Sequence, residues 1–309
     1  MSLADLDDEV RAFIAKSESF YPASANEASP AENRAIYDRM CAAFDRPRPP
    51  GLVVTDETLS ATDPARTLPI RRYRPPSAPR GRLVLYFHGG GFVVGGLHSH
   101  DGVCAELAAA SEHELVALDY RLAPEHLYPA ALDDAEAAYL SLHSTAQRIV
   151  VAGDSAGGNL AAALCLRLRR KGLPLPVGQV LIYPGLHPKA GRAEGTWRAD
   201  VPMLRASDIL VYRRLYTGQD ASDTKDAELA PLAAKDFAGL PPAAIFAADI
   251  DPLAEDAADY AAALRAAGGA ATLDPGIGLV HGHLRGRHSS ARIKRNFSEI
   301  AAALHSLCA

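Results

Sequence analysis

The sequence predicts an α/β protein whose mostly parallel sheet carries helices on both faces. Between about residue 80 and residue 309, short apolar runs alternate with longer segments of helical periodicity. Such alternation is typical of strand–helix–strand units, in which parallel strands are buried on both sides. A serine between glycines, Ser155, follows one apolar run and precedes a helical segment. Open α/β sheets place functional groups at this edge of the sheet.

The expected strands are short apolar runs. They cover Arg82–Phe87, Glu114–Leu118, Arg148–Ala152, Gln179–Tyr183, Ala243–Ala248 and Ala270–Leu273. Helices are expected over Val103–Ala110 and Asn159–Arg170, and the second has cations in its last turn, where they complement the helix dipole.

Two segments interrupt this alternation. Residues 1–48, here called the N-terminal segment, show helical periodicity and end at a Pro-rich boundary. Residues 186–219, here called the insertion, show no strand pattern. We expect the N-terminal segment and the insertion to form the two parts of a helical cap. The core would then comprise residues 49–185 and 220–309.

The turn at Gly153–Gly157 is the most informative feature of the chain. A serine between glycines at a strand-to-helix corner has its hydroxyl exposed on a sharp turn, which suits a nucleophile. A second glycine-rich turn, Gly89–Gly91, directly follows the expected strand Arg82–Phe87. Three glycines are typical of a flexible loop, but they also let backbone N–H groups converge on an oxyanion. Together the two turns predict a serine hydrolase.

Three segments, His88–Phe92, Tyr120–His126 and Gly153–Asn159, resemble the signature blocks of the hormone-sensitive-lipase-like esterases. These are the bacterial family IV carboxylesterases of the α/β-hydrolase fold. Asp251–Leu253 and His281–Gly282 resemble the blocks that carry the family's acid and base, and all the blocks occur in the family's order. The resemblance implies an α/β-hydrolase core with a helical cap.

A serine nucleophile needs a neighbouring base, and the base needs a carboxylate that fixes its tautomer. In α/β-hydrolases the acid and then the histidine follow the serine along the chain. The residues alone leave two candidates for each role, His281 or His283 for the base and Asp249 or Asp251 for the acid. The resemblance places the base on His281 and the acid on Asp251.

The resemblance also implies the rest of the site. The oxyanion hole would use the N–H groups of Gly89, Gly90, Gly91 and Ala156. Apart from the resemblance, Phe92, Trp197 and Met203 are candidate pocket residues, and each is equally a candidate for the core. The expected enzyme is a serine carboxylesterase that hydrolyses short- to medium-chain esters through an acyl-enzyme. The alternatives are a non-catalytic small-molecule binding protein on the same scaffold, or a thioesterase, peptidase or lipase with the same triad. Because all three triad positions are filled, we favour the esterase.

Composition excludes several other classes. A net charge of −5 gives no electrostatic basis for binding nucleic acid. No run approaches ~18 consecutive apolar residues, and the acidic N-terminus differs from a signal peptide, so we expect a cytoplasmic protein without membrane insertion. The four cysteines form no CxxC pair, so we expect no metal, no cofactor and no disulfide framework. The expected partner is a small-molecule ester, and formation of a homodimer stays open.

Overall fold

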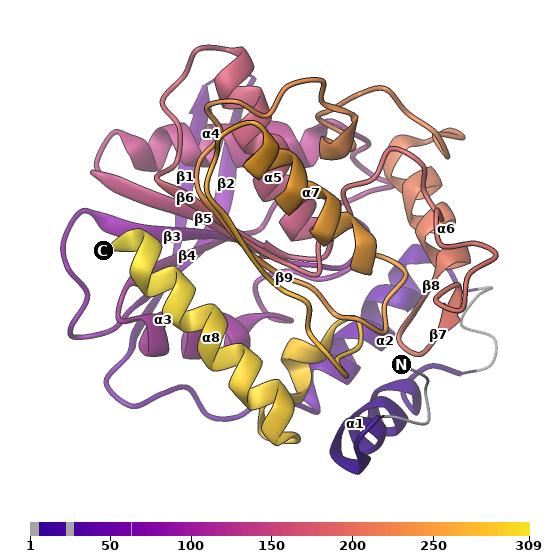
Figure 1. Ribbon diagram of the computed structural model, residues 1–309. Helices are drawn as coiled ribbons and strands as arrows, with labels where there is room; N and C mark the ends of the chain where they lie inside the picture. Colours follow the sequence, from indigo (N-terminus) through magenta and orange to yellow (C-terminus); the bar gives the residue numbers. More distant parts are fainter. Residues whose placement is uncertain (1–5, 23–27, 63) are drawn as a thin grey trace.

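The computed structural model describes residues 6–22, 28–62 and 64–309, so residues 1–5 and 23–27 of the expected cap lie outside the described residues. The central sheet has eight strands in the order β1-β2-β4-β3-β5-β6-β9-β10 (Figure 1). Their bounds are β1 Val53–Thr62, β2 Ala65–Arg74, β3 Arg82–Phe87, β4 Glu114–Leu118, β5 Arg148–Asp154, β6 Gly178–Ile182, β9 Ala243–Phe246 and β10 Ala271–Asp274. Strand β2 is antiparallel to both of its neighbours, and the other adjacent pairs are parallel. The predicted fold class is confirmed.

All six predicted strands are present, with ends shifted by at most two residues. The hairpin of β1 and β2 was not predicted from the sequence. Strand β1 is an edge strand whose side chains are mostly exposed or half-buried, so it lacks an apolar run. Strand β2 contains Pro69, paired with Thr58, and a proline inside a segment argues against a central strand. A polar hairpin at the edge of the sheet contains no apolar run, so the sequence pattern did not predict it.

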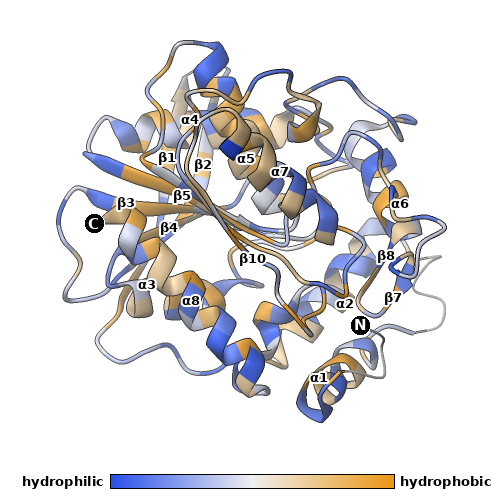
Figure 2. Ribbon diagram, in the orientation of Figure 1, coloured by the Kyte–Doolittle hydropathy of each residue, from blue (hydrophilic) through white to orange (hydrophobic). Residues whose placement is uncertain are grey.

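Helices cover both faces of the sheet. One face carries α3 (Asp101–Ser111) and α8 (Ala291–Cys308), below the sheet in Figure 1, and the other carries α4 (Ala130–His143), α5 (Ala156–Arg170) and α7 (Ala254–Ala266). The central strands are largely hydrophobic in Figure 2. Every side chain of β4 and β6 is buried, which is typical of parallel strands between two helical layers.

Three more helices gather near the carboxyl end of the sheet, on the right in Figure 1. They are α1 (Asp8–Glu18), α2 (Pro30–Ala42) and α6 (Ala206–Thr217). The insertion also contains the short hairpin of β7 (Asp200–Val201) and β8 (Leu204–Arg205), and two 3₁₀ helices, η3 (Pro231–Ala233) and η4 (His283–His288), lie further along the chain.

Helix α1 is part of the hydrophobic core. Phe13 is almost fully buried and packs edge-to-face on Phe44, with ring centroids 5.3 Å apart. Asp7 accepts a hydrogen bond from Arg292 of α8. Burial of such an aromatic ring contributes about 2 to 3 kcal/mol, so this helix is anchored to the core.

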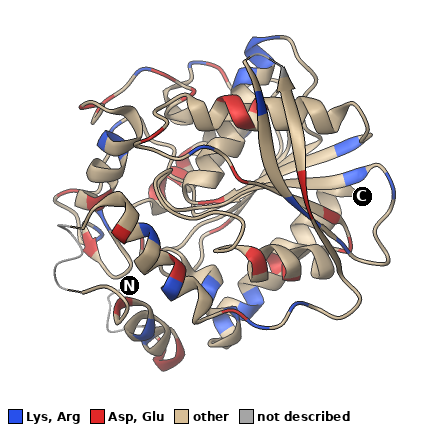
Figure 3. Ribbon diagram, turned by 180° about the vertical axis from the view of Figure 1, so that it is seen from behind, with Lys and Arg blue, Asp and Glu red and all other residues tan. Residues whose placement is uncertain are grey.

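Charged residues of both signs are interspersed in the opposite view of the molecule (Figure 3). Many of them pair across strands or between elements, as Arg71 does with Asp56 and Asp101. Within residues 6–22, 28–62 and 64–309, the helices are too short or too polar to cross a bilayer.

Candidate active site

Ser155 occupies a strained corner between β5 and α5. Its φ of 54° and ψ of −116° lie in a region that residues other than glycine rarely adopt. A Cβ on Gly157 would lie 1.9 Å from the carbonyl oxygen of Phe87, and one on Gly153 would lie 2.5 Å from the same atom. The two glycines are therefore required because α5 begins in direct contact with the end of β3.

A hydrogen-bonded chain links Ser155, His281 and Asp251. The Oγ of Ser155 lies 2.9 Å from Nε2 of His281, and Nδ1 of His281 lies 2.7 Å from Oδ2 of Asp251. Asp251 is fully buried, and its other oxygen accepts the N–H of Leu253 at 2.8 Å. Because an ionised carboxylate only accepts hydrogen bonds, Nδ1 carries a proton and Nε2 is free to accept one from the serine.

The two rival residues have other partners. Asp249 accepts the N–H of Gly278 at 2.7 Å and so holds the loop that precedes His281. His283 is fully buried, with Nδ1 2.9 Å from the carbonyl oxygen of Val280 and Nε2 2.8 Å from Oδ1 of Asn296. Neither side chain hydrogen-bonds to Ser155, so both have structural roles in this arrangement.

The glycine loop supplies fewer oxyanion donors than the sequence suggested. Gly89 donates its N–H to Oδ1 of Asp154 at 3.0 Å, so this group is already used, in contrast to the expectation. Gly90 and Gly91, with φ of +122° and +60°, line the cavity beside Ser155, as does Ala156. Within the described part of the chain, the N–H groups of these three residues have no acceptor.

Asp154 is a site residue that was not predicted from the sequence. Its buried carboxylate accepts hydrogen bonds from Gly89 and from the hydroxyl of Tyr86 at 2.7 Å. Burial alone would raise the pKa of Asp154, but His100, Arg285 and Tyr86 together hold it below its usual range. An aspartate at the end of an otherwise apolar strand was the signal in the sequence, since a buried carboxylate needs partners.

His88 supports the same loop without a proton-transfer role. Its ring stacks on Tyr120 with centroids 4.2 Å apart, and the Tyr120 hydroxyl donates to the carbonyl oxygen of His88 at 2.7 Å. Burial lowers the pKa of His88 to about 3, so the ring is neutral at pH 7. The ring therefore acts as a buried aromatic support.

A cavity of about 1180 Å³ opens onto the triad. Its lining includes Ser155, His281, Phe92 and Met203, together with residues of α2 and α6. Trp197 does not line it, contrary to the expectation. The Trp197 indole is 47% exposed and lies 4.4 Å from the guanidinium of Arg198, whose Nε donates to the carbonyl oxygen of Asp249. Neither Trp197 nor Arg198 lines the cavity, although residues on either side of them in the insertion do.

Two tyrosines of α6 pack against the glycine loop. The ring of Tyr216 stacks on Phe92 with centroids 3.8 Å apart, and a Cβ on Gly91 would lie 2.3 Å from the ring of Tyr212. Residues four apart lie on one face of a helix, so this aromatic spacing was the signal that α6 contacts the site.

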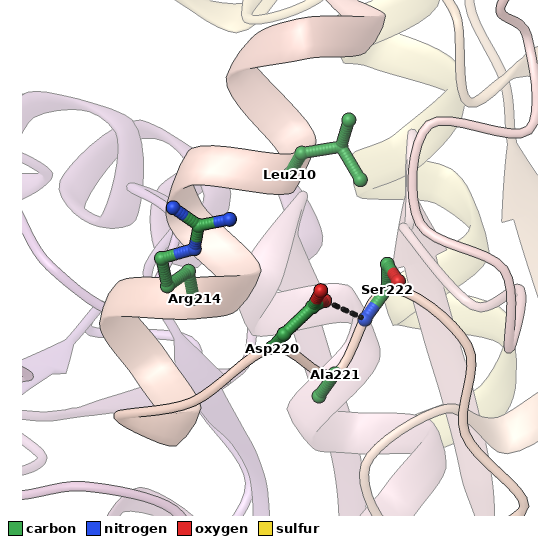
Figure 4. Close-up of a pocket in the computed structure, with 5 residues that line it drawn as sticks. All are labelled: Leu210, Arg214, Asp220, Ala221 and Ser222. Carbon is green, nitrogen blue, oxygen red and sulfur yellow. Dashed lines mark hydrogen bonds between the residues drawn. The ribbon is translucent and has the colours of Figure 1, made fainter.

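A second pocket, of about 170 Å³, lies at the end of α6 (Figure 4). It is lined by Leu210, Arg214, Asp220, Ala221 and Ser222. Asp220 accepts the N–H of Ser222 at 3.1 Å, which is an ordinary turn contact. None of the triad residues lines this pocket.

Residues 84–285 match the family model of the alpha/beta hydrolase fold, so the chain belongs to this family. It is 41% identical over 249 residues to the esterase LipI of Mycobacterium tuberculosis, covering 77% of each chain. It is 36% identical over 243 residues to an ethyl acetate hydrolase of Pseudomonas putida, covering 75% of this chain and 76% of that one.

The structure also resembles a solved esterase of the bacterial hormone-sensitive lipase family. The TM-score is 0.85 at 27% identity, and the match covers 98% of this chain and 99% of the other. Within the alpha/beta hydrolases, the chain is a carboxylic-ester hydrolase of the hormone-sensitive-lipase-like branch. The predicted family and enzyme class are confirmed.

Proposed function

We propose that this carboxylesterase uses Ser155 as nucleophile, His281 as general base and acid, and Asp251 as the carboxylate that orients His281. The observation that carries this proposal is the unbroken hydrogen-bond chain of 2.7 and 2.9 Å from Asp251 through His281 to Ser155. Hydroxyl, imidazole and carboxylate in this order can move the serine proton as the hydroxyl attacks a carbonyl carbon.

The reaction then proceeds in two halves. His281 accepts the proton of Ser155 as the serine oxygen bonds to the ester carbonyl, and returns it to the departing alcohol as the C–O bond breaks. A water molecule activated by His281 next hydrolyses the acyl-enzyme. In both halves the N–H groups of Gly90, Gly91 and Ala156 stabilise the oxyanion, a contribution of about 3 to 4 kcal/mol per donor in comparable enzymes.

We propose short- to medium-chain esters as the substrates. The aromatic residues Phe92, Tyr212 and Tyr216 line the cavity on the α6 side. The name of the ethyl acetate hydrolase relative is consistent with a small ester. Aromatic side chains in the lining favour the binding of an apolar acyl group.

We further propose that the N-terminal segment and the insertion act as the cap, and that the enzyme works in the cytoplasm. Four buried, unpaired cysteines support a reducing compartment, which cell fractionation would test. The homodimer stays a prediction for sedimentation analysis.

The central test is Ser155→Ala together with active-site labelling. We expect the folded variant to lose at least about 10⁴-fold in turnover, because no acyl-enzyme can form. A serine-directed organophosphate should label Ser155 in peptide mapping of the unmodified chain. Substantial hydrolysis by folded Ser155→Ala, or labelling of another residue, would refute the assignment.

A further inference from the structure

A buried polar cluster beside the glycine loop has no part in the proton transfers described above, although its four residues line the same cavity as Ser155 and His281. It consists of Asp154 at the end of β5, His100 before α3, Arg285 in η4 and Tyr37 in α2. The residues Asp154, His100 and Arg285 are each 5% exposed or less. Burying a guanidinium costs several kcal/mol unless it is paired and hydrogen-bonded, so this arrangement calls for a physical reason.

The four side chains form a continuous chain of contacts. One terminal nitrogen of Arg285 lies 3.0 Å from Nε2 of His100 and 3.1 Å from the hydroxyl of Tyr37. Nε2 of His100 lies 3.3 Å from Oδ1 of Asp154 and 3.4 Å from Oδ2. The other terminal nitrogen of Arg285 donates to the carbonyl oxygen of Ser99. One nitrogen, Nε2 of His100, thus lies between a buried cation and a buried anion. It can donate to Asp154 or accept from Arg285 but not both at once, so Arg285 acts on Asp154 through its charge.

Asp154 is the buried carboxylate whose negative charge balances the positive charge of Arg285. Within the described ranges, no carboxylate lies within ion-pairing distance of Arg285, whose contacts are a carbonyl, a hydroxyl and the His100 ring. The neighbouring Arg287, in contrast, pairs directly with Glu106 at 2.7 Å. At the low dielectric of a buried site, opposite charges attract strongly even when one nitrogen lies between them.

The carboxylate of Asp154 is one of the groups that hold the glycine loop in place. It accepts the N–H of Gly89, and the next two residues supply the proposed oxyanion donors. A protonated Asp154 would be a weaker acceptor for Gly89, because charge-assisted hydrogen bonds are roughly twice as strong as neutral ones. An error of about 1 Å in the donors can cost on the order of 100-fold in rate.

We infer that Arg285 is a positioning residue for the oxyanion hole: through its charge it maintains the Asp154 carboxylate that fixes Gly89 and thereby aims the N–H groups of Gly90 and Gly91. This inference rests on the proposed function. Tyr37 connects the same cluster to α2, so the N-terminal segment contributes to catalysis from beside the loop as well as lining the cavity.

The first test compares Arg285→Met, Arg285→Lys and the control Arg287→Met. Arg287 lies in the same 3₁₀ helix and is equally buried, but its partner Glu106 lies on α3. We expect Arg285→Met to lower kcat by about 10- to 100-fold with little change in KM, since a misplaced donor weakens transition-state stabilisation alone. Arg285→Lys should recover part of kcat, and Arg287→Met should lower only the melting temperature.

The second test is a double-mutant cycle with Asp154→Asn, a substitution of nearly equal volume. If Arg285 acts through Asp154, adding Arg285→Met to Asp154→Asn should lower kcat no further. Independent losses that multiply would overturn the inference, because Arg285 would then act through the nearby His281 loop. A change confined to KM or to the melting temperature would overturn it as well.

If Arg285→Met does not fold, Arg285→Lys serves in the same cycle with the same criteria. The proposed function has its own separate test in Ser155→Ala. If Ser155→Ala abolishes turnover but the losses of kcat in the double-mutant cycle multiply, only the positioning role of Arg285 is refuted.

Discussion

Three aspartates near Ser155 and His281 have different roles because their hydrogen-bond partners differ. Asp251 faces His281 and an N–H group, Asp154 faces the glycine loop, and Asp249 holds the N–H of Gly278. All are short carboxylates at strand ends, so residue type alone does not separate them. The hydrogen-bond partners distinguish the three aspartates, since each carboxylate orients the group that donates to it.

Asp251→Asn and Asp249→Asn should therefore give opposite outcomes. An amide at residue 251 no longer favours the correct tautomer of His281, and turnover should fall by about 10³- to 10⁴-fold. An amide at residue 249 can still accept the N–H of Gly278 through its oxygen, so turnover should change little. Steady-state kinetics on one soluble ester decides between them, and the reverse pattern would move the acid to Asp249.

Asp256 predicts a pH dependence of stability. This carboxyl is buried under the insertion, where it accepts the N–H groups of Leu186 and His187. Burial raises the pKa of Asp256 to about 7 in the folded protein, above its unfolded value of 3.8. The folded state therefore binds the proton more tightly, and this contribution to the unfolding free energy is lost as pH rises from about 4 through 7.

Asp256→Asn should remove that contribution while keeping an oxygen for the two N–H groups. Relative to the unmodified protein, the variant should gain roughly 2 to 4 kcal/mol in unfolding free energy between pH 5 and pH 8. Urea unfolding at both pH values measures the difference. A constant difference between the two proteins at both pH values would contradict the assignment.

At the scale of elements, two helices hold the glycine loop from outside the sheet. Arg34 of α2 donates to the carbonyl oxygens of Val93 and Ala123 and pairs with Glu125, with contacts of 2.6 to 2.9 Å. Helix α6 packs its tyrosines on Gly91 and Phe92. The loop that carries the oxyanion donors is therefore fixed between the core, the N-terminal segment and the insertion.

Gly91→Ala should displace α6 from the loop. The new methyl group would lie 2.3 Å from the ring of Tyr212, in addition to the cost of a φ of +60°. We expect kcat to fall by at least about 10-fold, since donor placement is sensitive to about 1 Å. Gly172→Ala is the matched control, because Gly172 has a φ of +65° and a methyl group there would have no atom within 4 Å.

We expect a second substitution at Tyr212 to restore the activity of Gly91→Ala, because it removes the ring that the new methyl group would contact. Removing the ring in Gly91→Ala/Tyr212→Ala should restore kcat toward that of Tyr212→Ala alone. Equal effects of Gly91→Ala and Gly172→Ala on kcat would show that backbone strain, not the contact with α6, matters. Failure of the rescue would point to the same conclusion.

At the scale of the molecule, the carboxyl ends of the parallel strands bring distant residues together. Gly90 follows β3, Ser155 follows β5, Asp251 follows β9 and His281 follows β10, and these four strands are parallel. The N-terminal segment and the insertion then enclose the resulting edge. We propose that the sheet supplies the chemistry and that the enclosing helices limit which ester can reach it.

This division between the sheet and the enclosing helices predicts how activity depends on the length of the acyl chain. Each methylene that fits should add up to about 0.8 kcal/mol of binding, while one that does not fit gains nothing. The ratio kcat/KM should rise with acyl length and then fall sharply, as a series of p-nitrophenyl esters would measure. A preference for emulsified long-chain triglycerides, with activation at their surface, would instead identify a lipase with a mobile lid.

Local patterns sufficed for the six parallel strands, of which all but the edge strand β10 are largely buried, and for the corner at Ser155. A parallel strand must be apolar on both faces, and a nucleophile between strand and helix must have glycine neighbours, so both requirements appear in consecutive residues. The hairpin of β1 and β2 did not emerge in this way, because an edge hairpin needs neither an apolar run nor a glycine turn.

The remaining features depended on contacts between distant segments. Tertiary structure decided that Gly89 serves Asp154 and not the oxyanion, that Trp197 lies outside the cavity, and that Arg285 lies beside the glycine loop. Sequence determines which groups can donate, accept or carry charge. Which partner each group meets depends on how strands and helices far apart in the chain pack, because hydrogen bonds and ion pairs act over only a few ångströms.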